Sequence, residues 1–412
     1  MPARAGSPLT LKEYYAAALR RSETVSIQSQ LIDQAVEKNR QAVAAIKPSL
    51  KGFANYTWQQ SPPGGASSFP NALSYQPEVG VQLTQPLFSG FREFAALRQA
   101  KDLVGAQRDD YRNACRLLFN DVVQNFYTIL SDERDLANLK DEIHQNELRA
   151  KDLRARVRIG RSRESELLSV QSTIATLRAQ VEQGRGQLHV ARENFAFLSG
   201  LSADTPLQDS DSLPKQVASV NDYLAATETR SDVQAARARE SAARENVKLA
   251  RGAYLPTVGL TGNYYLQRPG FLNDINWSVQ LNLSIPIYSG GALVSATREA
   301  VSQQSQAQLT LTQVTRQARQ EIRSLHDSTA FDLKQIDALQ TATDAAKKNY
   351  QAQLRDYRLG LVTNLDVLQA LTSYQENQRA LDRARYATKT DWLKLLVASG
   401  QRKLPAAPEN RP

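Results

Sequence analysis

Residues 85–90 read QPLFSG, and residues 285–290 read IPIYSG. Both copies stand where apolar and polar residues stop alternating and a long polar stretch of helical period begins. Proline cannot donate a hydrogen bond to a neighbouring strand, and glycine turns readily at positive φ, so each copy predicts a strand that bends sharply into a helix. The four residues that define these strand-to-helix corners are Pro86, Gly90, Pro286 and Gly290.

The corner motif belongs to a repeat with an offset of 200 residues (286 minus 86). The same offset relates Gly160 to Gly360 and residues 198–200 to residues 398–400. An offset that is kept over such a length indicates two structural repeats within one chain. We expect a first repeat at residues 1–200, an inter-repeat linker at 201–219, a second repeat at 220–400 and a disordered tail at 401–412.

The composition is typical of long helices rather than of several globular domains. Of the 412 residues, 41% are hydrophobic, and long stretches contain almost no glycine or proline. The formal charge of +9 invites a nucleic-acid interpretation, but acidic residues lie among the basic ones almost everywhere, as in residues 132–135. We therefore interpret the charge as a solvated helix face and expect no nucleic-acid partner. The alternative from another functional class is a soluble basic coiled-coil scaffold that binds nucleic acid.

The sequence offers no residues for catalysis or for metal binding. Cys115 is the single cysteine, and His144, His189 and His326 are too widely spaced to suggest a metal site. No nucleophile, phosphate-binding or zinc-protease motif occurs, so we expect no enzyme, no metal and no cofactor. Residues 1–8 contain no apolar segment. We therefore expect a chain without its signal peptide, either cytosolic or in a mature or trimmed form.

Each repeat predicts the same four elements in the same order. In the first repeat these are a helix at about 9–46, a β-hairpin at 48–88, a long helix at 90–159 and a return helix at 164–199. In the second repeat they are a helix at about 220–253, a β-hairpin at 256–288, a long helix at 290–359 and a return helix at 363–399. A helix of about 70 residues is about 105 Å long. Its apolar residues recur at intervals of seven, which predicts a coiled-coil seam.

Along the strands expected in both hairpins, apolar residues alternate with other residues, most of them Asn, Gln, Ser or Thr, so each strand has an apolar face and a polar face. We expect strands at 50–59, 78–85, 257–265 and 276–285, with a loop at 61–72. An ordinary sandwich hairpin also alternates, but four strands cannot build a two-sheet core. The strand lengths fit the roughly 9 to 11 residues of a tilted membrane strand. We therefore expect these apolar residues to face lipid: Val79, Val81, Leu83, Trp277, Val279, Leu281 and Leu283.

These features resemble the TolC family of outer-membrane efflux proteins, also called outer membrane factors. The resemblance rests on the paired corner motifs, on the glycines at 160 and 360, and on residues 357–368, which read YRLGLVTNLDVL. It implies a homotrimer in which each chain gives four strands to one 12-stranded barrel in outer-membrane lipid. The helices would form a tunnel, a long α-barrel, across the periplasm. Unpaired sheet edges are not tolerated in a bilayer, so closure between chains is also the physical expectation.

The resemblance further implies a function and partners. The chain is expected to be the exit duct of a tripartite efflux system in the Gram-negative outer membrane, a passive conduit that works with a periplasmic adaptor and an inner-membrane transporter. The alternative within the family is the outer-membrane duct of a type I protein secretion system. The sequence does not identify the exported substrate, because a water-filled tunnel discriminates only weakly between substrates.

The resemblance also implies roles for residues near the hairpin tips at Gly160 and Gly360. Asp366 matches a position that forms an acidic ring at the tunnel aperture, and Glu166 stands at the equivalent place in the first repeat; helix capping by the Thr363-to-Asp366 box is the alternative role. A second acidic position of the family falls on Gln369, which departs from the pattern. We expect Arg161, Arg163 and Arg358 to tether neighbouring tips. The expected adaptor-docking residues are Ile159, Gly160, Leu359, Gly360, Leu361 and Thr363.

Overall fold

The computed structural model describes residues 8–60, 75–270, 272–402 and 404. The expected hairpin loop at 61–72 lies outside these residues, as does most of the expected tail at 401–412. The chain forms two compact units. Unit 1 comprises residues 1–27, 112–230 and 315–412, and unit 2 comprises residues 28–111 and 231–314. Each unit therefore draws on both sequence repeats.

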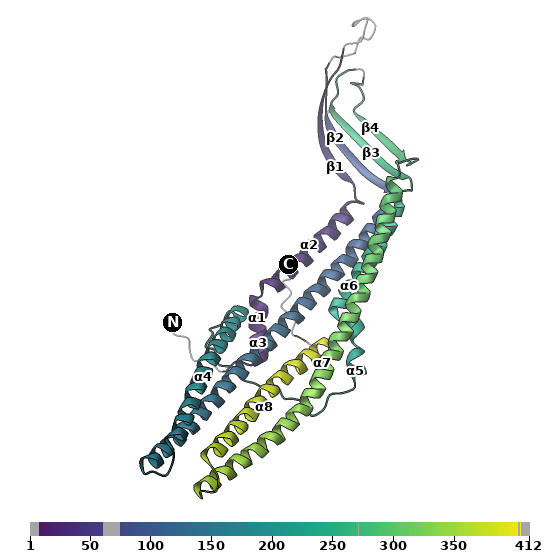
Figure 1. The fold of residues 1–412 in the computed structure, drawn as a ribbon. Helices are drawn as coiled ribbons and strands as arrows, with labels where there is room; N and C mark the ends of the chain where they lie inside the picture. The colour runs from purple at the N-terminus through teal and green to yellow at the C-terminus, as the bar shows by residue number, and fades with distance from the viewer. Residues whose placement is uncertain (1–7, 61–74, 271, 403, 405–412) are drawn as a thin grey trace. The chain divides into compact units, whose positions relative to one another are not determined.

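Unit 2 contains one antiparallel sheet in the order β1-β2-β3-β4 (Figure 1). Its strands are β1 (Ser49–Trp58), β2 (Tyr75–Phe88), β3 (Thr257–Gln267) and β4 (Trp277–Ser284). The register places Leu50, Leu83, Gly262 and Val279 opposite one another in turn, and it does the same for Gly52, Val81, Tyr264 and Trp277. Because side chains alternate across a strand, the seven apolar residues named above share one face of the sheet. The polar residues between them share the other.

Two expected strand limits are corrected by the structure. β2 begins at Tyr75 rather than at residue 78, and it continues past Pro86 to Phe88. Pro86 still pairs with Gly259 of β3, and the register shifts between Pro86 and Phe88. A strand tolerates proline at such an irregularity, because the ladder is already disrupted there. In the second repeat β4 ends at Ser284, before Pro286.

Two long helices run through both units. They are α3 (Arg92–Arg158) and α7 (Ala292–Arg358), each of 67 residues and therefore about 100 Å long at 1.5 Å per residue. The other helices are α1 (Leu11–Arg21), α2 (Glu23–Ala44), α4 (Glu164–Ser199), α5 (Val220–Leu224), α6 (Ser231–Gly252) and α8 (Asn364–Ala398). Among the described residues, no helix combines the length and the apolar character needed to cross a membrane. The mostly helical fold class with four strands and an internal repeat is confirmed.

The two helices expected ahead of the hairpins are not continuous, and that prediction was wrong. The helix expected at 9–46 breaks at Ser22, which has ψ 113°, and the Ser22 hydroxyl accepts a hydrogen bond from the Val25 N–H at 3.3 Å. The helix expected at 220–253 breaks at Arg230, which has ψ 138°. Serine before an acidic residue is a strong helix start, because its oxygen and the acid both satisfy the first free N–H groups. The first break lies at the serine of Ser22–Glu23, and the second lies at Arg230, directly before Ser231–Asp232.

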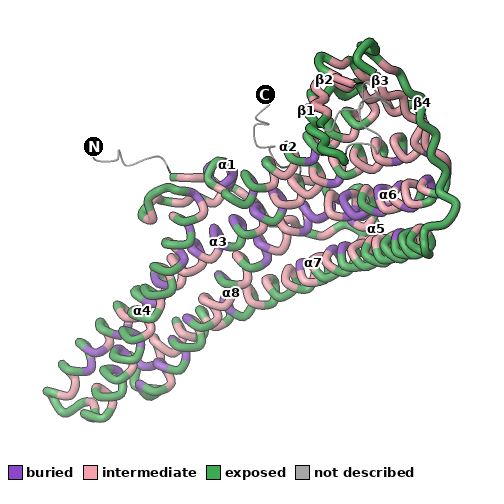
Figure 2. Tube along the Cα trace, turned by 90° about the horizontal axis from the view of Figure 1, so that it is seen from above, coloured by how far each residue is buried: buried purple, intermediate pink, exposed green. Residues whose placement is uncertain are grey.

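The core of unit 1 packs α1 against α3 and α4. The Tyr14 and Phe195 ring centres lie 4.6 Å apart, and the Tyr14 hydroxyl donates to the Asn125 Oδ1 at 2.8 Å. The Asn125 amide in turn donates to the carbonyl of Ala191 at 2.9 Å. Cys115 is buried, and its carbonyl accepts from the Tyr15 hydroxyl at 3.1 Å. Buried residues recur along α3, α4 and α8, whereas the first part of α7 is mostly exposed (Figure 2).

Candidate functional site at the hairpin tips

Unit 1 ends in two helical hairpins, and glycine forms both turns. Gly160 lies between α3 and α4 with φ 73°, and Gly360 lies between α7 and α8 with φ 76°. A Cβ added to either glycine would meet nothing within 4 Å, so backbone conformation rather than packing calls for glycine there. Ile159, Leu359 and Leu361 beside these turns are exposed to between 65 and 73%. The tips thus present apolar side chains to solvent.

Asp366 caps the first turn of α8. Its Oδ2 accepts hydrogen bonds from the Thr363 N–H at 2.7 Å and from the Thr363 hydroxyl at 2.6 Å, and the Asp366 N–H donates back to that hydroxyl oxygen at 3.4 Å. The Thr363 hydroxyl and N–H hold the pKa of Asp366 below its usual value. Asp366 is therefore ionised at neutral pH, whatever further role it has.

Glu166 occupies the equivalent position in the first repeat, but its contacts differ. The Ser162 hydroxyl donates to the Glu166 Oε2 at 2.5 Å. The N-cap of α4 is Arg163, whose side chain makes no capping hydrogen bond. The two tips are therefore alike in backbone and unlike in polar contacts.

The remaining expected gate residues form no ion pair with the residues that the structure describes. Arg161, Arg163 and Arg358 are exposed, and no acidic group of the described residues lies within ion-pair distance of them. Gln369 is exposed on α8. The expectation that these arginines tether neighbouring tips remains a prediction about contacts between chains.

A contact between Tyr357 and two arginines that the sequence did not single out joins the two hairpins. The Tyr357 ring of α7 lies between two guanidinium groups of α3, 4.3 Å from that of Arg149 and 4.8 Å from that of Arg156. The Arg149 Nε also donates to the Asn364 Oδ1 at the start of α8, at 2.5 Å. Burial lowers the pKa of Arg149. The sequence placed Tyr357 only at the start of the stretch 357–368, and no local pattern shows which arginines reach it.

An apolar cluster continues this contact away from the tips. Leu368 of α8 packs with Leu153 of α3 and with Val170 and Ile174 of α4, and Ala150 completes the cluster. Leu153 and Val170 are fully buried. The first turns of α8 are therefore seated against the α3–α4 hairpin by apolar burial as well as by the arginine contacts.

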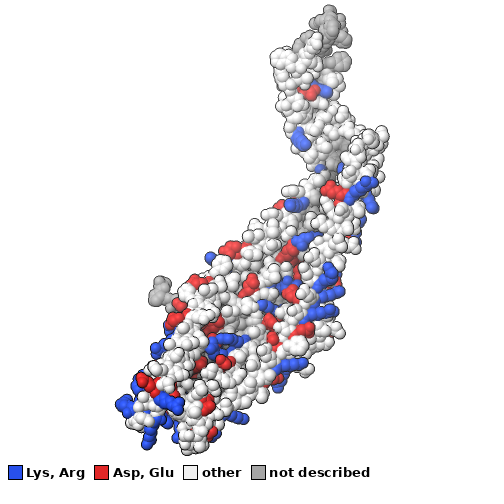
Figure 3. Space-filling view, in the orientation of Figure 1, with Lys and Arg blue, Asp and Glu red and all other residues white. Residues whose placement is uncertain are grey.

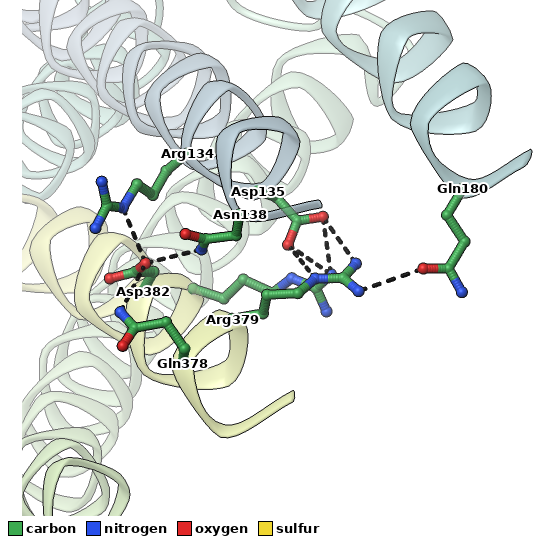
Figure 4. A network of polar contacts seen from close by, with 8 residues as sticks. Arg134, Asp135, Asn138, Gln180, Gln378, Arg379 and Asp382 are labelled. Atoms are coloured by element: carbon green, nitrogen blue, oxygen red, sulfur yellow. Dashed lines mark hydrogen bonds and ion pairs between the residues drawn. The ribbon is translucent and has the colours of Figure 1, made fainter. Parts of the chain in front are cut away.

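A polar network joins α8 to α3 further along the same helices (Figure 4). Asp135 accepts two hydrogen bonds from Arg379, at 2.8 and 3.0 Å, and two from Arg383 at 3.1 Å. Burial acts to raise the pKa of Asp135, but the hydrogen bonds and charges of the two arginines outweigh it and hold that pKa below its usual value. Arg379 also donates to Gln180 of α4 at 3.3 Å.

Asp382 is the second centre of this network. It accepts from Arg134 and Asn138 of α3, each at 3.0 Å, and from Gln378 of α8 at 3.3 Å. Asp382 is buried. Its several donors compensate for the loss of water around the carboxylate.

Glu142 lies on α3 between Asp135 and the hairpin tip, and it is only 5% exposed. Burial raises its pKa to about 6, the charge of Arg379 opposes this, and the charges of Glu376 and Asp135 add to it. One turn later the Asn146 amide nitrogen donates to the Glu142 carbonyl at 2.9 Å, while the Asn146 Oδ1 is buried without a donor. The site therefore holds a buried carboxyl group whose pKa is raised well above its ordinary value.

Comparison with known proteins assigns the family. The profile described as "Outer membrane efflux protein" matches residues 14–201 and 223–401, so the chain belongs to the outer membrane efflux protein family. The two matched segments correspond to the two repeats.

Individual relatives agree with this assignment. The outer membrane efflux protein BepC of Brucella suis is 25% identical over 375 residues, which cover 87% of this chain and 78% of BepC. The alkaline protease secretion protein AprF of Pseudomonas aeruginosa is 24% identical over 339 residues, covering 78% of this chain and 69% of AprF. The crystal structure of the outer membrane protein VceC of Vibrio cholerae has the same fold, with a TM-score of 0.85, 20% identity and coverage of 95% of this chain and 96% of VceC.

Proposed function

We propose that this outer-membrane efflux protein is the exit duct of a tripartite system and acts as a passive conduit from the periplasm to the exterior. The observation that carries the proposal is the sheet of unit 2. One of its faces is continuously apolar, and its other face carries amides and hydroxyls. The outer edges of strands β1 and β4 pair with no further strand of the described residues. A sheet of that kind suits lipid on one side and water on the other, once its edges are paired.

The proposal includes a homotrimer with outer-membrane lipid around its strands. Three copies would supply 12 strands and close the sheet into a barrel, and the long helices would line the tunnel. Lys and Arg side chains mix with Asp and Glu over the helices, while the sheet is nearly free of charge (Figure 3). Mixed charge favours a solvated helical wall over a nucleic-acid surface.

The proposed partners are a periplasmic adaptor and an inner-membrane transporter. The exposed apolar side chains of Ile159, Leu359 and Leu361 support adaptor docking at the tips, because apolar groups at the end of a polar rod gain from being covered. Asp366 and Glu166 support an acidic aperture, since like carboxylates around a threefold axis focus a negative field. Arg161, Arg163 and Arg358, which are exposed, are the proposed tethers between neighbouring tips.

The experiment is copurification from membranes. Tagged protein in detergent should bring down an adaptor and an inner-membrane transporter encoded with it. Leu359→Asn combined with Leu361→Asn should reduce the yield of adaptor at least about tenfold, which corresponds to the loss of about 1.4 kcal/mol. Leu148→Asn, at an exposed leucine of α3 before the tip, is the matched control. Extraction without detergent, or nucleic acid as the only partner, would overturn the proposal.

The resemblance to AprF, a protease secretion protein, supports a second candidate, a duct for protein secretion. The two functions differ in the transporter that copurifies and in the cargo. A deletion strain that accumulates a fluorescent dye and recovers on complementation indicates small-molecule efflux. A strain that retains a secreted polypeptide instead indicates protein secretion.

A further inference from the structure

The tip of the first hairpin carries much more positive charge than the tip of the second. Residues 149–163, around Gly160, contain seven basic residues and one acidic residue. The equivalent residues 349–363, around Gly360, contain two basic residues and one acidic residue. Lys and Arg side chains gather at the α3–α4 end of unit 1 (Figure 3). Both glycines turn with nearly the same φ, so the turn itself does not require the extra charge.

Four of the seven basic residues already have contacts or a proposed role. The guanidinium groups of Arg149 and Arg156 lie over the Tyr357 ring, which seats them against α7. Arg161 and Arg163 follow the turn and are the proposed tethers between neighbouring tips. These assignments leave three basic residues of the first tip without a contact or a role.

The three remaining residues are Lys151, Arg154 and Arg158, which we call the α3 basic patch. All three are exposed, and no acidic group of the described residues lies within ion-pair distance of them. Their spacing of three and four residues places them on one face of α3, over about 10 Å of helix. Arg149, which contacts α7 and α8, lies about 140° to 180° around the helix from each of them. The patch therefore points away from the second hairpin.

Helix stability accounts for only one member of the patch. Positive side chains are favourable in the last turn of a helix, and this effect fades beyond that turn. Arg158 lies in the last turn of α3, and the second repeat keeps an arginine there. Lys151 and Arg154 lie earlier, where α7 carries Gln351 and Leu354. Like charges three and four residues apart also repel one another, so an acidic partner would relieve a repulsion within the patch.

We propose that the α3 basic patch binds an acidic helix of the periplasmic adaptor. The inference rests on the proposed function and specifies the chemistry of one docking surface. Charge complementarity selects the partner, because a helix with Asp or Glu three and four residues apart would set a carboxylate opposite each cation. Ile159, which is 65% exposed, adds an apolar contact at the end of the patch. The first hairpin would thus recognise the adaptor mainly by charge, and the second through Leu359 and Leu361.

The position of the patch disfavours an anionic bilayer, which positive charge also attracts. Lys151 lies nine residues before Gly160 (160 minus 151), which is about 13 Å along the helix. A flat membrane that met the tip end-on would reach the turn but not Lys151. It would also approach the ionised Asp366 of the second tip, which it repels. A helix laid along α3 meets neither obstacle.

The test is binding of the purified adaptor, the one that copurifies in the experiment above, to the full-length protein in detergent. Binding is measured by biolayer interferometry at about 0.05 M and about 0.5 M NaCl. Lys151→Gln combined with Arg154→Gln should raise the Kd at least about tenfold at the lower salt concentration. The difference from wild type should shrink at the higher concentration, because salt screens exposed charges.

Lys347→Gln combined with Lys348→Gln is the matched control. Both lysines are exposed on α7 and form no ion pair with the described residues, so this variant removes the same charge from the second hairpin. Its Kd should equal that of wild type. Lys151→Glu combined with Arg154→Glu should abolish binding at low salt, and an adaptor whose contacting acidic residues are changed to Lys should restore it. Every variant is first checked for the particle mass and melting temperature of wild type.

The outcomes separate this inference from the proposed function. A salt-sensitive loss of binding that is confined to the patch variants supports the inference. Unchanged binding, or an equal loss in the lysine control, overturns it. Patch-dependent binding to phosphatidylglycerol vesicles without an effect on the adaptor overturns it in favour of lipid. Loss of the adaptor only through Leu359→Asn with Leu361→Asn rejects the patch and keeps the proposed function, whereas a wild type that binds no adaptor contradicts both.

Discussion

Replacing Glu142 by Gln should stabilise the protein at neutral pH and have no such effect in acid. Glu142 is buried between α3 and α8, and its pKa is raised from the ordinary 4.5 to about 6. The folded state therefore prefers the protonated form. Its favourable contribution is complete below pH 4.5 and is lost as the pH rises through about 6.

The size of the effect follows from the pKa difference. The difference between the ordinary pKa of 4.5 and the raised pKa of about 6 corresponds to about 2 kcal/mol per chain, because each pKa unit is worth 1.36 kcal/mol. Glutamine keeps the shape of the side chain without the charge and supplies an N–H donor, while the Asn146 Oδ1 nearby is buried without one. The variant should therefore gain up to about 2 kcal/mol at pH 8 and little or nothing at pH 4.5.

The assay is thermal unfolding of the detergent-solubilised protein at several pH values. Wild type should lose stability relative to Glu142→Gln as the pH rises from 4.5 through about 6, and the two melting curves should converge in acid. Glu376→Gln is the control, since Glu376 is exposed on α8 and acts on Glu142 only through its charge. An equal melting temperature difference at all pH values would show that Glu142 is not the titrating group.

Three further predictions concern the faces and the tips. Leu281→Arg should lower the stability of the barrel in the membrane by about 2 to 4 kcal/mol and reduce the yield of membrane-extracted trimer, whereas Gln280→Arg should be tolerated. Equal yields of the two variants would contradict the assignment of the lipid-facing side. Divalent cations added on the tip side should block single-channel conductance of wild type, and Asp366→Asn with Glu166→Gln should abolish the block; a persisting block would leave Asp366 only as a helix cap. Tyr357→Ala should lower the free energy of unfolding by about 3 to 5 kcal/mol and loosen the contact between the hairpins, which would be measured as faster hydrogen exchange in α8. Tyr357→Phe should keep most of the protection from exchange, because the ring remains between the arginines.

Local signals in the sequence were enough for most of the fold. The corner motifs, the tip glycines and the Thr363-to-Asp366 box each depend on the backbone preferences of a few neighbouring residues. The sequence alone therefore predicts them. The breaks at Ser22 and Arg230 were missed because the helical period continues on both sides. The repeat carried a usable signal there, since Ser followed by an acidic residue occurs at both places.

Contacts between distant segments could not be predicted in the same way. Arg149 and Tyr357 are more than 200 residues apart, and Asp135 and Arg379 are separated by 244 residues. Whether such side chains meet depends on the rotation of each helix about its axis. Surface arginines are abundant along both long helices, so no sequence pattern distinguishes the ones that bind across the hairpins.

The polar face of the sheet has a consequence for permeation. Gln82, Asn263 and Ser278 form a chain of side-chain hydrogen bonds across it, and Asn282 donates to Thr261 at 3.3 Å. Of the charged strand residues described on this face, Glu78 is paired with Arg268 at 3.1 Å, which leaves Lys51. In the proposed trimer, ions crossing this segment would meet oriented dipoles and one cationic side chain per chain. Under a salt gradient, Lys51→Gln should shift the reversal potential toward cation preference relative to wild type, in which the acidic groups of the tips act in the same direction.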